Sequence, residues 1–360
     1  MAAPRRPSAI DLFCGAGGLS LGLARAGFRV ALGLDSWGPA GESYRANFSH
    51  PLIDRDIEEV SADEILEAAG LKKGRVDLVA GGPPCQGFSI QRIGADTDRR
   101  NQLVLEFGRM VKEIRPRGFL MENVPGLLGK RGRHVADAFS ELLAPDYETV
   151  FERVNAADHG VPQIRRRILC FGWRRGAEPV RFPAAKEGPV PVRTAWDAIG
   201  DLPSPPLDFT APPEDPLHAR SRLSELNQER LRSIPPGGGF EDLPMELRVA
   251  CHRGGASKIG HRNVYGRLAP DEPAVTITAR FDSFTRGKFA HPKEDRNITL
   301  REGARLQTFP DEHRFFGTRE EIAALIGNAV PPRLAEVAGK AILESIAGER
   351  RSERSRTLAA

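Results

Sequence analysis

The amino-terminal part of the chain holds the feature that most constrains its fold: an apolar segment, a cluster of glycines and then an apolar helical pattern. Residues 9–13 predict a strand, Gly15, Gly17 and Gly18 form the expected turn, and residues 19–24 continue as a helix. Glycines at the amino end of a helix let the backbone approach a ligand closely. This order is typical of a nucleotide-binding βαβ unit, so we expect an α/β fold.

A second strand is predicted at residues 28–34, and Asp35 follows it. An acidic side chain at this point of a βαβ unit can accept hydrogen bonds from ribose hydroxyls. The glycines depart from the G-x-G-x-x-G spacing, which favours a nucleoside without a pyrophosphate over NAD. The alternative is a tight turn with Asp35 in solvent. Residues 51–57 predict a short third strand near Asp56, which could meet an adenine amino group.

One cysteine stands on a loop directly after an apolar strand predicted at residues 75–80. Pro83 and Pro84 restrict the backbone before Cys85, and Gly87 leaves freedom just beyond it. Open α/β sheets place their ligands at the carboxyl ends of strands, so Cys85 is a candidate nucleophile. The alternative is a small buried hydrophobic residue, the commonest fate of a free cysteine.

The strand predicted at residues 117–121 delivers two further polar groups, Glu122 and Asn123, to the same edge of the sheet. Two chemical groups at neighbouring strand ends make a site more credible than one. Between the loop and this strand, residues 92–100 are polar and basic and could form a lid, and residues 103–114 predict a helix.

Farther along, a helix is predicted at residues 134–143 and strands at residues 148–155 and 168–172. Gln163, Arg165 and Arg167 alternate, so an extended chain places them on one face, where arginines could reach a phosphate or a pyrimidine carbonyl. The alternative is a solvated basic edge strand. Residues 174–263 are rich in proline and glycine and predict a separate, loop-rich region.

Regular patterns return in the last hundred residues. Residues 274–278 alternate like a strand, and residues 299–308 predict a helix in which Thr299 and Glu302 form a capping box. Residues 326–332 open a last helix with Pro332 in its first turn. The basic, polar end from about Gly348 is expected to fray.

Length and composition limit the class of protein but do not identify its function. A chain of 360 residues is expected to form two domains, and no apolar run is long enough to cross a bilayer. The start lacks the apolar core of a signal peptide, so we expect a cytoplasmic protein. The 4 cysteines lack a CxxC spacing, which predicts free thiols and no metal site. A net charge of +4 is compatible with a polyanionic partner.

Taken together, these motifs resemble the bacterial cytosine-C5 DNA methyltransferases of restriction-modification systems. The match runs in family order over nearly the whole chain, through residues 11–18, the Pro83-Pro84-Cys85-Gln86 loop, Glu122-Asn123-Val124, the Gln163-x-Arg165-x-Arg167 pattern, residues 301–311 and residues 327–332. Residues 174–263 are unmatched, and in this family that position holds the variable target-recognition region.

The resemblance implies a Rossmann-like S-adenosylmethionine-dependent methyltransferase sheet with helices on both faces. The expected division is a cofactor-binding catalytic domain at residues 1–173 and 318–346, a smaller loop- and strand-rich target-recognition domain at 174–317, and a flexible tail at 347–360. It also implies a cofactor, S-adenosyl-L-methionine, which becomes S-adenosyl-L-homocysteine, and no metal. The implied cofactor-binding residues are Phe13, Gly15, Ala16, Gly17, Gly18, Leu19, Asp35, Ser36, Asp56, Ile57, Pro83, Asn328 and Val330. Members often carry a bulky residue after the ribose-binding acid, whereas this chain has Ser36 with Trp37 beside it, so which of them meets the adenine stays open.

The resemblance implies these catalytic roles. Cys85 adds to carbon 6 of cytosine, because carbon 5 is a poor nucleophile until a thiolate activates the ring. Glu122 holds N3 of the base, and Arg165 contacts its carbonyl oxygen. Asn123 and Gln86 support this group, and a water removes the proton from carbon 5.

The substrate implied is double-stranded DNA, from which the cytosine must be flipped, with residues 86–100 closing over it. The expected DNA-binding residues are Ser89, Arg100, Arg167 and Arg253, and the unmatched region could read bases with some of Arg220, Arg222, Arg230, Arg232, Arg248, Arg253 and Arg262. For each of these arginines the alternative is a solvated surface charge. We expect a monomer that is associated with the bacterial nucleoid through DNA, and a cognate restriction endonuclease as a functional rather than a physical partner.

Three other functions stay open. A transfer-RNA cytosine methyltransferase shares the scaffold, but those relatives carry a Cys-Phe-Thr tripeptide in the recognition region, which this chain lacks. An inactive DNA-binding regulator is disfavoured by the intact Cys85, Glu122 and Arg165. A small-molecule methyltransferase needs neither the cysteine loop nor the long recognition region.

Overall fold

The computed structural model describes residues 5–84, 102–183, 191–253 and 264–359, which fall into two compact units. Unit 1 comprises Met1–Asn155, Arg166–Pro189 and Val330–Ala360, and unit 2 comprises Ala156–Arg165 and Val190–Ala329. Compared with the expected division, unit 2 gains residues 156–165 and 318–329, and residues 174–189 belong to unit 1 instead. The two gained segments include parts of the predicted motifs, so the boundary between the units divides those motifs.

A seven-stranded sheet forms the centre of unit 1, in the order β3-β2-β1-β4-β5-β7-β6. Its strands are β1 (Ser8–Leu12), β2 (Arg29–Leu34), β3 (Leu52–Ile53), β4 (Leu78–Gly81), β5 (Gly118–Asn123), β6 (Tyr147–Asn155) and β7 (Arg166–Arg174). The first five run parallel, whereas β7 is antiparallel to both β5 and β6. The chain order reverses between β1 and β4, and ligands of open α/β sheets bind at such a point.

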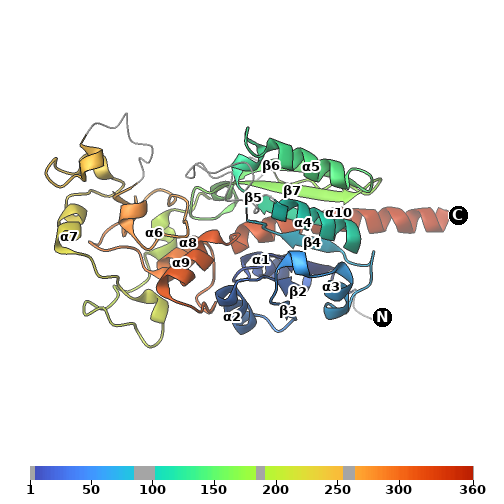
Figure 1. Cartoon of the computed structure of the whole chain (residues 1–360), viewed down its shortest axis with the longest axis horizontal. Coiled ribbons are helices and arrows are strands. Elements are labelled where there is room, and N and C mark those ends of the chain that lie inside the picture. Colours follow the sequence, from blue (N-terminus) through green and yellow to red (C-terminus); the bar gives the residue numbers. More distant parts are fainter. Residues whose placement is uncertain (1–4, 85–101, 184–190, 254–263, 360) are drawn as a thin grey trace. The chain divides into compact units, whose positions relative to one another are not determined.

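Helices cover both faces of this sheet (Figure 1). They are α1 (Gly18–Ala26), α2 (Gly38–Asn47), α3 (Ala62–Ala68), α4 (Gln102–Ile114), α5 (Arg133–Leu143) and α10 (Pro332–Ala359). Helices α3, α4 and α5 contribute Ile65, Phe107 and Phe139 to one large core cluster with strand residues such as Ile10. On the opposite face α1 packs against α10, since a Cβ on Gly22 would overlap Ala335.

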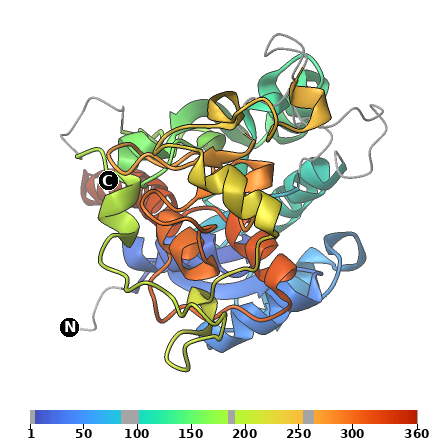
Figure 2. The same ribbon diagram turned by 90° about the vertical axis from the view of Figure 1, so that its left-hand side faces the viewer.

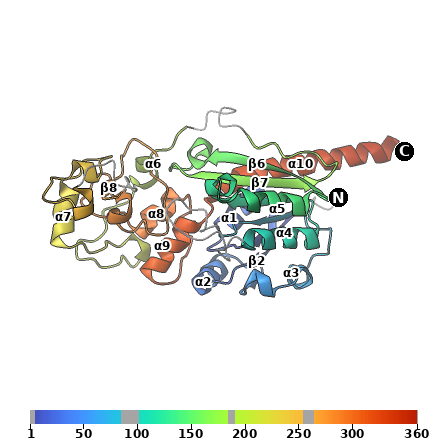
Figure 3. The ribbon, with the colours of Figure 1, turned by 45° about the horizontal axis from the view of Figure 1, so that its top comes forward.

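Two predicted elements of unit 1 differ in extent. The third strand is only β3, Leu52–Ile53, because the chain then turns into a 3-10 helix, Ile57–Glu59, which Asp56 caps by accepting a hydrogen bond from the Glu58 amide at 3.1 Å. The end expected to fray from Gly348 instead continues α10 to Ala359, and Figure 3 shows this helix extending past the rest of unit 1.

Unit 2 consists of short helices joined by long loops, as the view in Figure 2 shows. Its elements are α6 (Ala195–Ile199), α7 (Glu225–Arg232), α8 (Leu300–Leu306), α9 (Arg319–Asn328), and the parallel pair β8 (Gly266–Arg267) and β9 (Lys288–Ala290). The prediction of a strand at residues 274–278 is wrong, because this segment forms only a bridge between Ala274 and Gln163. Among the described helices of the chain, none is long and apolar enough to span a membrane.

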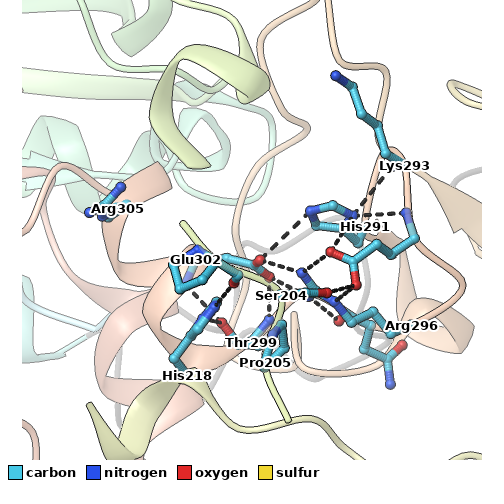
Figure 4. Close-up of polar contacts among 12 residues, drawn as sticks. Ser204, Pro205, His218, His291, Lys293, Arg296, Thr299, Glu302 and Arg305 are labelled. Atoms are coloured by element: carbon cyan, nitrogen blue, oxygen red, sulfur yellow. Dashed lines mark hydrogen bonds and ion pairs between the residues drawn. The ribbon is translucent and has the colours of Figure 1, made fainter. Parts of the chain in front are cut away.

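A buried polar network stabilises unit 2 around the start of α8 (Figure 4). Arg296 donates to both oxygens of Glu302, at 2.7 and 2.8 Å, and Thr299 forms the predicted capping box with Glu302. Burial raises the pKa of Glu302, but the hydrogen bonds and charge of Arg296 outweigh it and leave that pKa below its usual value. His218 lies 3.0 Å from the Thr299 hydroxyl, and Arg220 reaches the network through Glu294. The prediction of this cap from sequence is therefore confirmed.

Candidate active site

The turn after β1 has a backbone shape that most residues avoid. Phe13, Gly15 and Gly17 have φ values of 63°, 54° and 90°, in the left-handed region. Such a conformation costs little for glycine but is unusual for a bulky residue such as Phe13, and it is a common feature of functional sites. On the Cβ side of Gly15 no described heavy atom lies within 4 Å. The turn therefore leaves open space beside its backbone.

Asp35 ties this turn to the end of β2. Its carboxylate accepts one hydrogen bond from the Gly15 amide at 2.8 Å and one from the Trp37 amide at 2.9 Å, through different oxygens. Burial raises the pKa of Asp35 above its usual value, although both amide hydrogen bonds act to lower it. Each carboxylate oxygen has a second acceptor position. Asp35 can therefore hold the turn and still accept a ligand hydroxyl.

A chain of hydrogen bonds runs from the buried Asp11 to the half-buried His50. The Ser20 hydroxyl donates to Asp11 at 2.6 Å, lies 2.7 Å from the Tyr44 hydroxyl, and that hydroxyl lies 2.7 Å from Nε2 of His50. Burial raises the pKa of Asp11 to about 7. The second oxygen of Asp11, Oδ1, is buried and has no hydrogen-bond partner among the described residues. An unpartnered buried carboxylate oxygen beside an open turn is a feature that a cationic ligand group would satisfy.

The strand ends at the centre of the sheet bring several predicted residues together. Asn123 donates from its amide nitrogen to the Pro83 carbonyl at 3.2 Å, so the last residue of β5 anchors the segment that leads into the cysteine loop. A Cβ placed on Gly82 would lie 3.8 Å from Glu122 and 3.8 Å from Val330. Glu122, Pro83 and Val330 therefore surround one point at the carboxyl edge.

The two arginines of the Gln163-x-Arg165-x-Arg167 pattern lie in different surroundings. Nε of Arg167 is 2.9 Å from Oε1 of Glu122, an ion pair without hydrogen-bond alignment, since that oxygen has no hydrogen-bond partner. Arg165 is 1% exposed and donates to the carbonyls of Ile277, Gly327 and Ala329 at 2.9, 3.1 and 2.9 Å. The Arg165 guanidinium is thus engaged with carbonyls of unit 2, and its expected contact with the base carbonyl oxygen stays a prediction.

The register of β5 against β7 explains which arginine reaches Glu122. Glu122 pairs with Leu169, so Arg167, two residues along, lies on the same face as its diagonal neighbour. Strand β7 begins at Arg166, and the chain before it turns into unit 2. Alternation alone placed both arginines on one face. The register, which the sequence does not reveal, selects Arg167.

The other predicted site residues divide by their location. Cys85, Gln86, Ser89 and Arg100 lie outside the described residues. Gly18 and Leu19 are buried at the start of α1, and Ala16 is buried in the turn before it. Ser36 and Trp37 are exposed, whereas Asp56 caps the 3-10 helix and Ile57 belongs to the core. Asn328 is the exposed last residue of α9 in unit 2.

The arginines predicted to read DNA are mostly engaged within unit 2. Four donate to backbone carbonyls of that unit: Arg220 to Pro205, Arg230 to Leu247, Arg248 to Leu243 and Arg253 to Arg248. Arg222 lies over the ring of Phe209 at 4.4 Å. Arg232 is exposed at the end of α7, and its side chain forms no hydrogen bond or ion pair with any described residue. Arg262 lies outside the described residues.

Comparisons with known proteins extend these observations to the whole chain. The family model for C-5 cytosine-specific DNA methylases matches residues 8–344. Type II methylase M.HgiDII of Herpetosiphon aurantiacus is 34% identical over 97% of this chain and 98% of its own length. Type II methyltransferase M1.HphI of Haemophilus parahaemolyticus is 36% identical over 93% of this chain and 86% of its own length.

A solved structure supports the same assignment. A prophage-encoded E. coli protein that carries the name of a DNA modification methyltransferase superposes with a TM-score of 0.72 at 28% identity, over 94% of this chain and 99% of the other. With a family model that spans both units and relatives that are similar over nearly their full length, this chain belongs to the C-5 cytosine-specific DNA methylase family.

Proposed function

We propose that this enzyme transfers a methyl group from S-adenosyl-L-methionine to carbon 5 of a cytosine within a short sequence of double-stranded DNA, as the modification half of a restriction-modification system. The observation that carries the proposal is the grouping at the carboxyl edge of the sheet: the Glu122 and Arg167 pair lies beside Gly82, three residues before Cys85. The names of the relatives, Type II methyltransferases, support the restriction-modification role.

In this proposal Cys85 is the nucleophile. Its thiolate adds to carbon 6, and the electron pair of the 5,6 double bond moves to make carbon 5 nucleophilic. Methylation follows at carbon 5, after which a base removes the carbon-5 proton and the bond between sulfur and carbon 6 breaks. Asn123 is a positioning residue, because its hydrogen bond to the Pro83 carbonyl fixes the start of the cysteine loop against β5.

Glu122 holds N3 of the base, where a proton or a strong hydrogen bond makes the thiolate addition easier. Its Oε1 is buried and has no hydrogen-bond partner among the described residues, which leaves it an acceptor or, when protonated, a donor for the ring. We assign the positive charge beside the base to Arg167 rather than to Arg165. The guanidinium of Arg165 already donates to three carbonyls, whereas Arg167 contacts Glu122 itself.

The glycine turn and Asp35 fit the proposed cofactor. The open space beside Gly15 admits a ligand close to the backbone, Asp35 retains acceptor positions for ribose hydroxyls, and the unpartnered oxygen of Asp11 suits a cationic ligand. When bound, the cofactor supplies an electrophilic methyl group. Val330, beside Gly82, would limit the space between cofactor and base.

A cytosine stacked in a duplex cannot reach these groups, so the proposal includes flipping the base out of the helix. Sequence reading is assigned to unit 2. Arg222 and Arg232 are its best candidates for contacts with bases or phosphates, because the other described arginines from the predicted set donate to carbonyls of the unit itself.

The test is to incubate the protein with S-adenosyl-L-methionine and duplex DNA of random sequence in which 5-fluorocytosine replaces cytosine. Fluorine cannot leave carbon 5 as a cation, so a covalent complex should accumulate. We expect mass spectrometry to find a methylated adduct on Cys85 that is absent in Cys85→Ser, and sequencing of the trapped DNA to give the target site. An adduct with fluorocytosine-containing transfer RNA but not with DNA would refute the DNA substrate. The absence of an adduct with either nucleic acid would refute the proposed methyltransferase activity.

A further inference from the structure

The edge of the sheet opposite the proposed active site carries an unusual concentration of positive charge. Two cavities of about 600 and 430 Å³ lie there in unit 1 and share Gly74 and Arg174. Nine basic and two acidic residues line them, a formal excess of seven positive charges. The whole chain carries +4, so the remainder of the chain is net negative by three. The basic character of this protein therefore resides at the amino edge of its sheet.

Five of these basic residues are unengaged. Arg5, Arg29, Lys72, Lys73 and Arg75 are exposed, and within the described ranges their side chains form no hydrogen bond or ion pair. Like charges that are held together without partners repel one another and oppose folding. A bound polyanion would remove this repulsion.

The two acids do not neutralise the cluster. Asp77 accepts hydrogen bonds from the Ser8 amide and hydroxyl at 2.8 and 3.1 Å and lies 3.5 Å from Arg117. Asp146 lies 3.6 Å from Arg115. Each acid is thus already engaged with neighbours, and the five unengaged cations keep their full charge.

The fold spreads these charges along a line instead of gathering them around a point. Arg29 begins β2, Arg75 precedes β4, Arg117 precedes β5 and Arg174 ends the antiparallel β7. The pairing registers align these strand ends, with Ser8 opposite Arg29 and Gly118 opposite Trp173. Four strand spacings, roughly 19 Å, separate β2 from β7, and the unengaged Arg29 and Arg75 mark the first two of these spacings. That length matches about five or six base pairs of duplex, whose phosphates repeat every ~3.4 Å along each strand.

We propose that the amino edge of the sheet, defined by Arg5, Arg29, Lys72, Lys73 and Arg75, binds the phosphate backbone of a second segment of double-stranded DNA. The inference rests on the proposed action on DNA but concerns the opposite edge of unit 1. A single nucleotide would need converging groups, whereas this line of separate cations suits a long, regular polyanion. Contacts of this kind carry no sequence information and are lost as salt rises. They would keep the enzyme on DNA while it searches for its target.

The first experiment removes the charges without touching the described site. A variant with Arg29→Gln, Lys72→Gln, Lys73→Gln and Arg75→Gln is compared with a charge-conserving control, Arg29→Lys, Lys72→Arg, Lys73→Arg and Arg75→Lys. For long DNA, the slope of log affinity against log salt should fall by about 0.9 for each lost contact, up to about 3.6. The control should keep the wild-type slope. Methylation of saturating short duplexes of about two helical turns, ~20 base pairs, should be unchanged in both.

The second experiment locates the DNA directly. Wild-type protein is acetylated alone and with long DNA, after its active site has been trapped on a short fluorocytosine duplex. Long DNA should protect Lys72 and Lys73, while tripolyphosphate or phosphatidylglycerol vesicles should not. An unchanged slope in the glutamine variant, no protection by long DNA, or equal protection by tripolyphosphate would each overturn the inference. Failure of the wild-type enzyme to form the trapped complex would instead refute the proposed function, and the salt slopes would still test the amino edge.

Discussion

Arg165 and Arg167 differ by two positions in the sequence, yet the structure predicts opposite effects when each is replaced. Arg165→Met removes a buried guanidinium that donates to the carbonyls of Ile277, Gly327 and Ala329. Hydrogen bonds from a charged group contribute about 1.5–3 kcal/mol each, and the three carbonyls would be left without partners. We therefore expect unit 2 to lose at least about 4 kcal/mol of unfolding free energy.

This loss should be large in a thermal scan. In domains of about 150–250 residues each kcal/mol shifts the unfolding midpoint by roughly 2–4 °C, so about 4 kcal/mol corresponds to roughly 8–16 °C. Arg167→Gln removes a single, partly exposed ion pair and should lower the midpoint by less than Arg165→Met does. Its kcat should fall by about 10²–10³, the usual cost of losing one group that stabilises developing charge.

Differential scanning calorimetry and single-turnover methylation measure the two quantities on the same preparations. Arg166→Gln is the matched control, because Arg166 is exposed between the two and should change neither quantity. The reasoning would be refuted if Arg165→Met kept the wild-type midpoint but lost activity, or if Arg167→Gln unfolded early and kept its kcat.

Three further predictions follow from buried groups. In the protein without cofactor, the raised pKa of Asp11, about 7, means that stability should fall as pH rises from about 4 to 7, and Asp11→Asn should remove that dependence in urea titrations. Glu302→Gln should destabilise unit 2 by about 3–5 kcal/mol, because Arg296 would remain buried without its partner. The difference in unfolding free energy between wild type and variant should be present at pH 7 and shrink in acid, because protonation of Glu302 removes its stabilising charge in the wild type as well. Gly327→Ala should unfold at a lower denaturant concentration by overlap with the backbone of Thr278, whereas Gly38→Ala, with open space around it, should not.

Local sequence patterns predicted the elements whose causes are local. The strand, glycine turn and helix at the amino terminus appear as β1, the turn and α1, and Thr299 caps α8 with Glu302 as expected. Glu122 was expected just past a strand and lies inside the end of β5, still at the carboxyl edge. In each case residues a few positions apart suffice to fix the structure.

Features that depend on distant partners were not predictable in this way. The segment 274–278 alternates like a strand, but its backbone forms only one bridge, between Ala274 and Gln163, so no ladder forms. The partners of Arg165 lie 112 to 164 residues farther along the chain. The basic residues that line the two cavities are scattered through the sequence from Arg5 to Arg175, and only the order of the strands brings them together.

Because α1 packs on α10, unit 1 cannot complete its fold until the end of the chain has been synthesised. Gly22 and Ala335, which touch in the folded molecule, are 313 positions apart. At about 5–20 residues per second, a ribosome needs roughly 16–63 s to make the chain between them. For that time the face of α1 that α10 will cover is open to solvent and to chaperones. A nascent or prematurely terminated chain therefore presents an uncovered first helix directly behind its glycine turn, and completion of the last helix closes it.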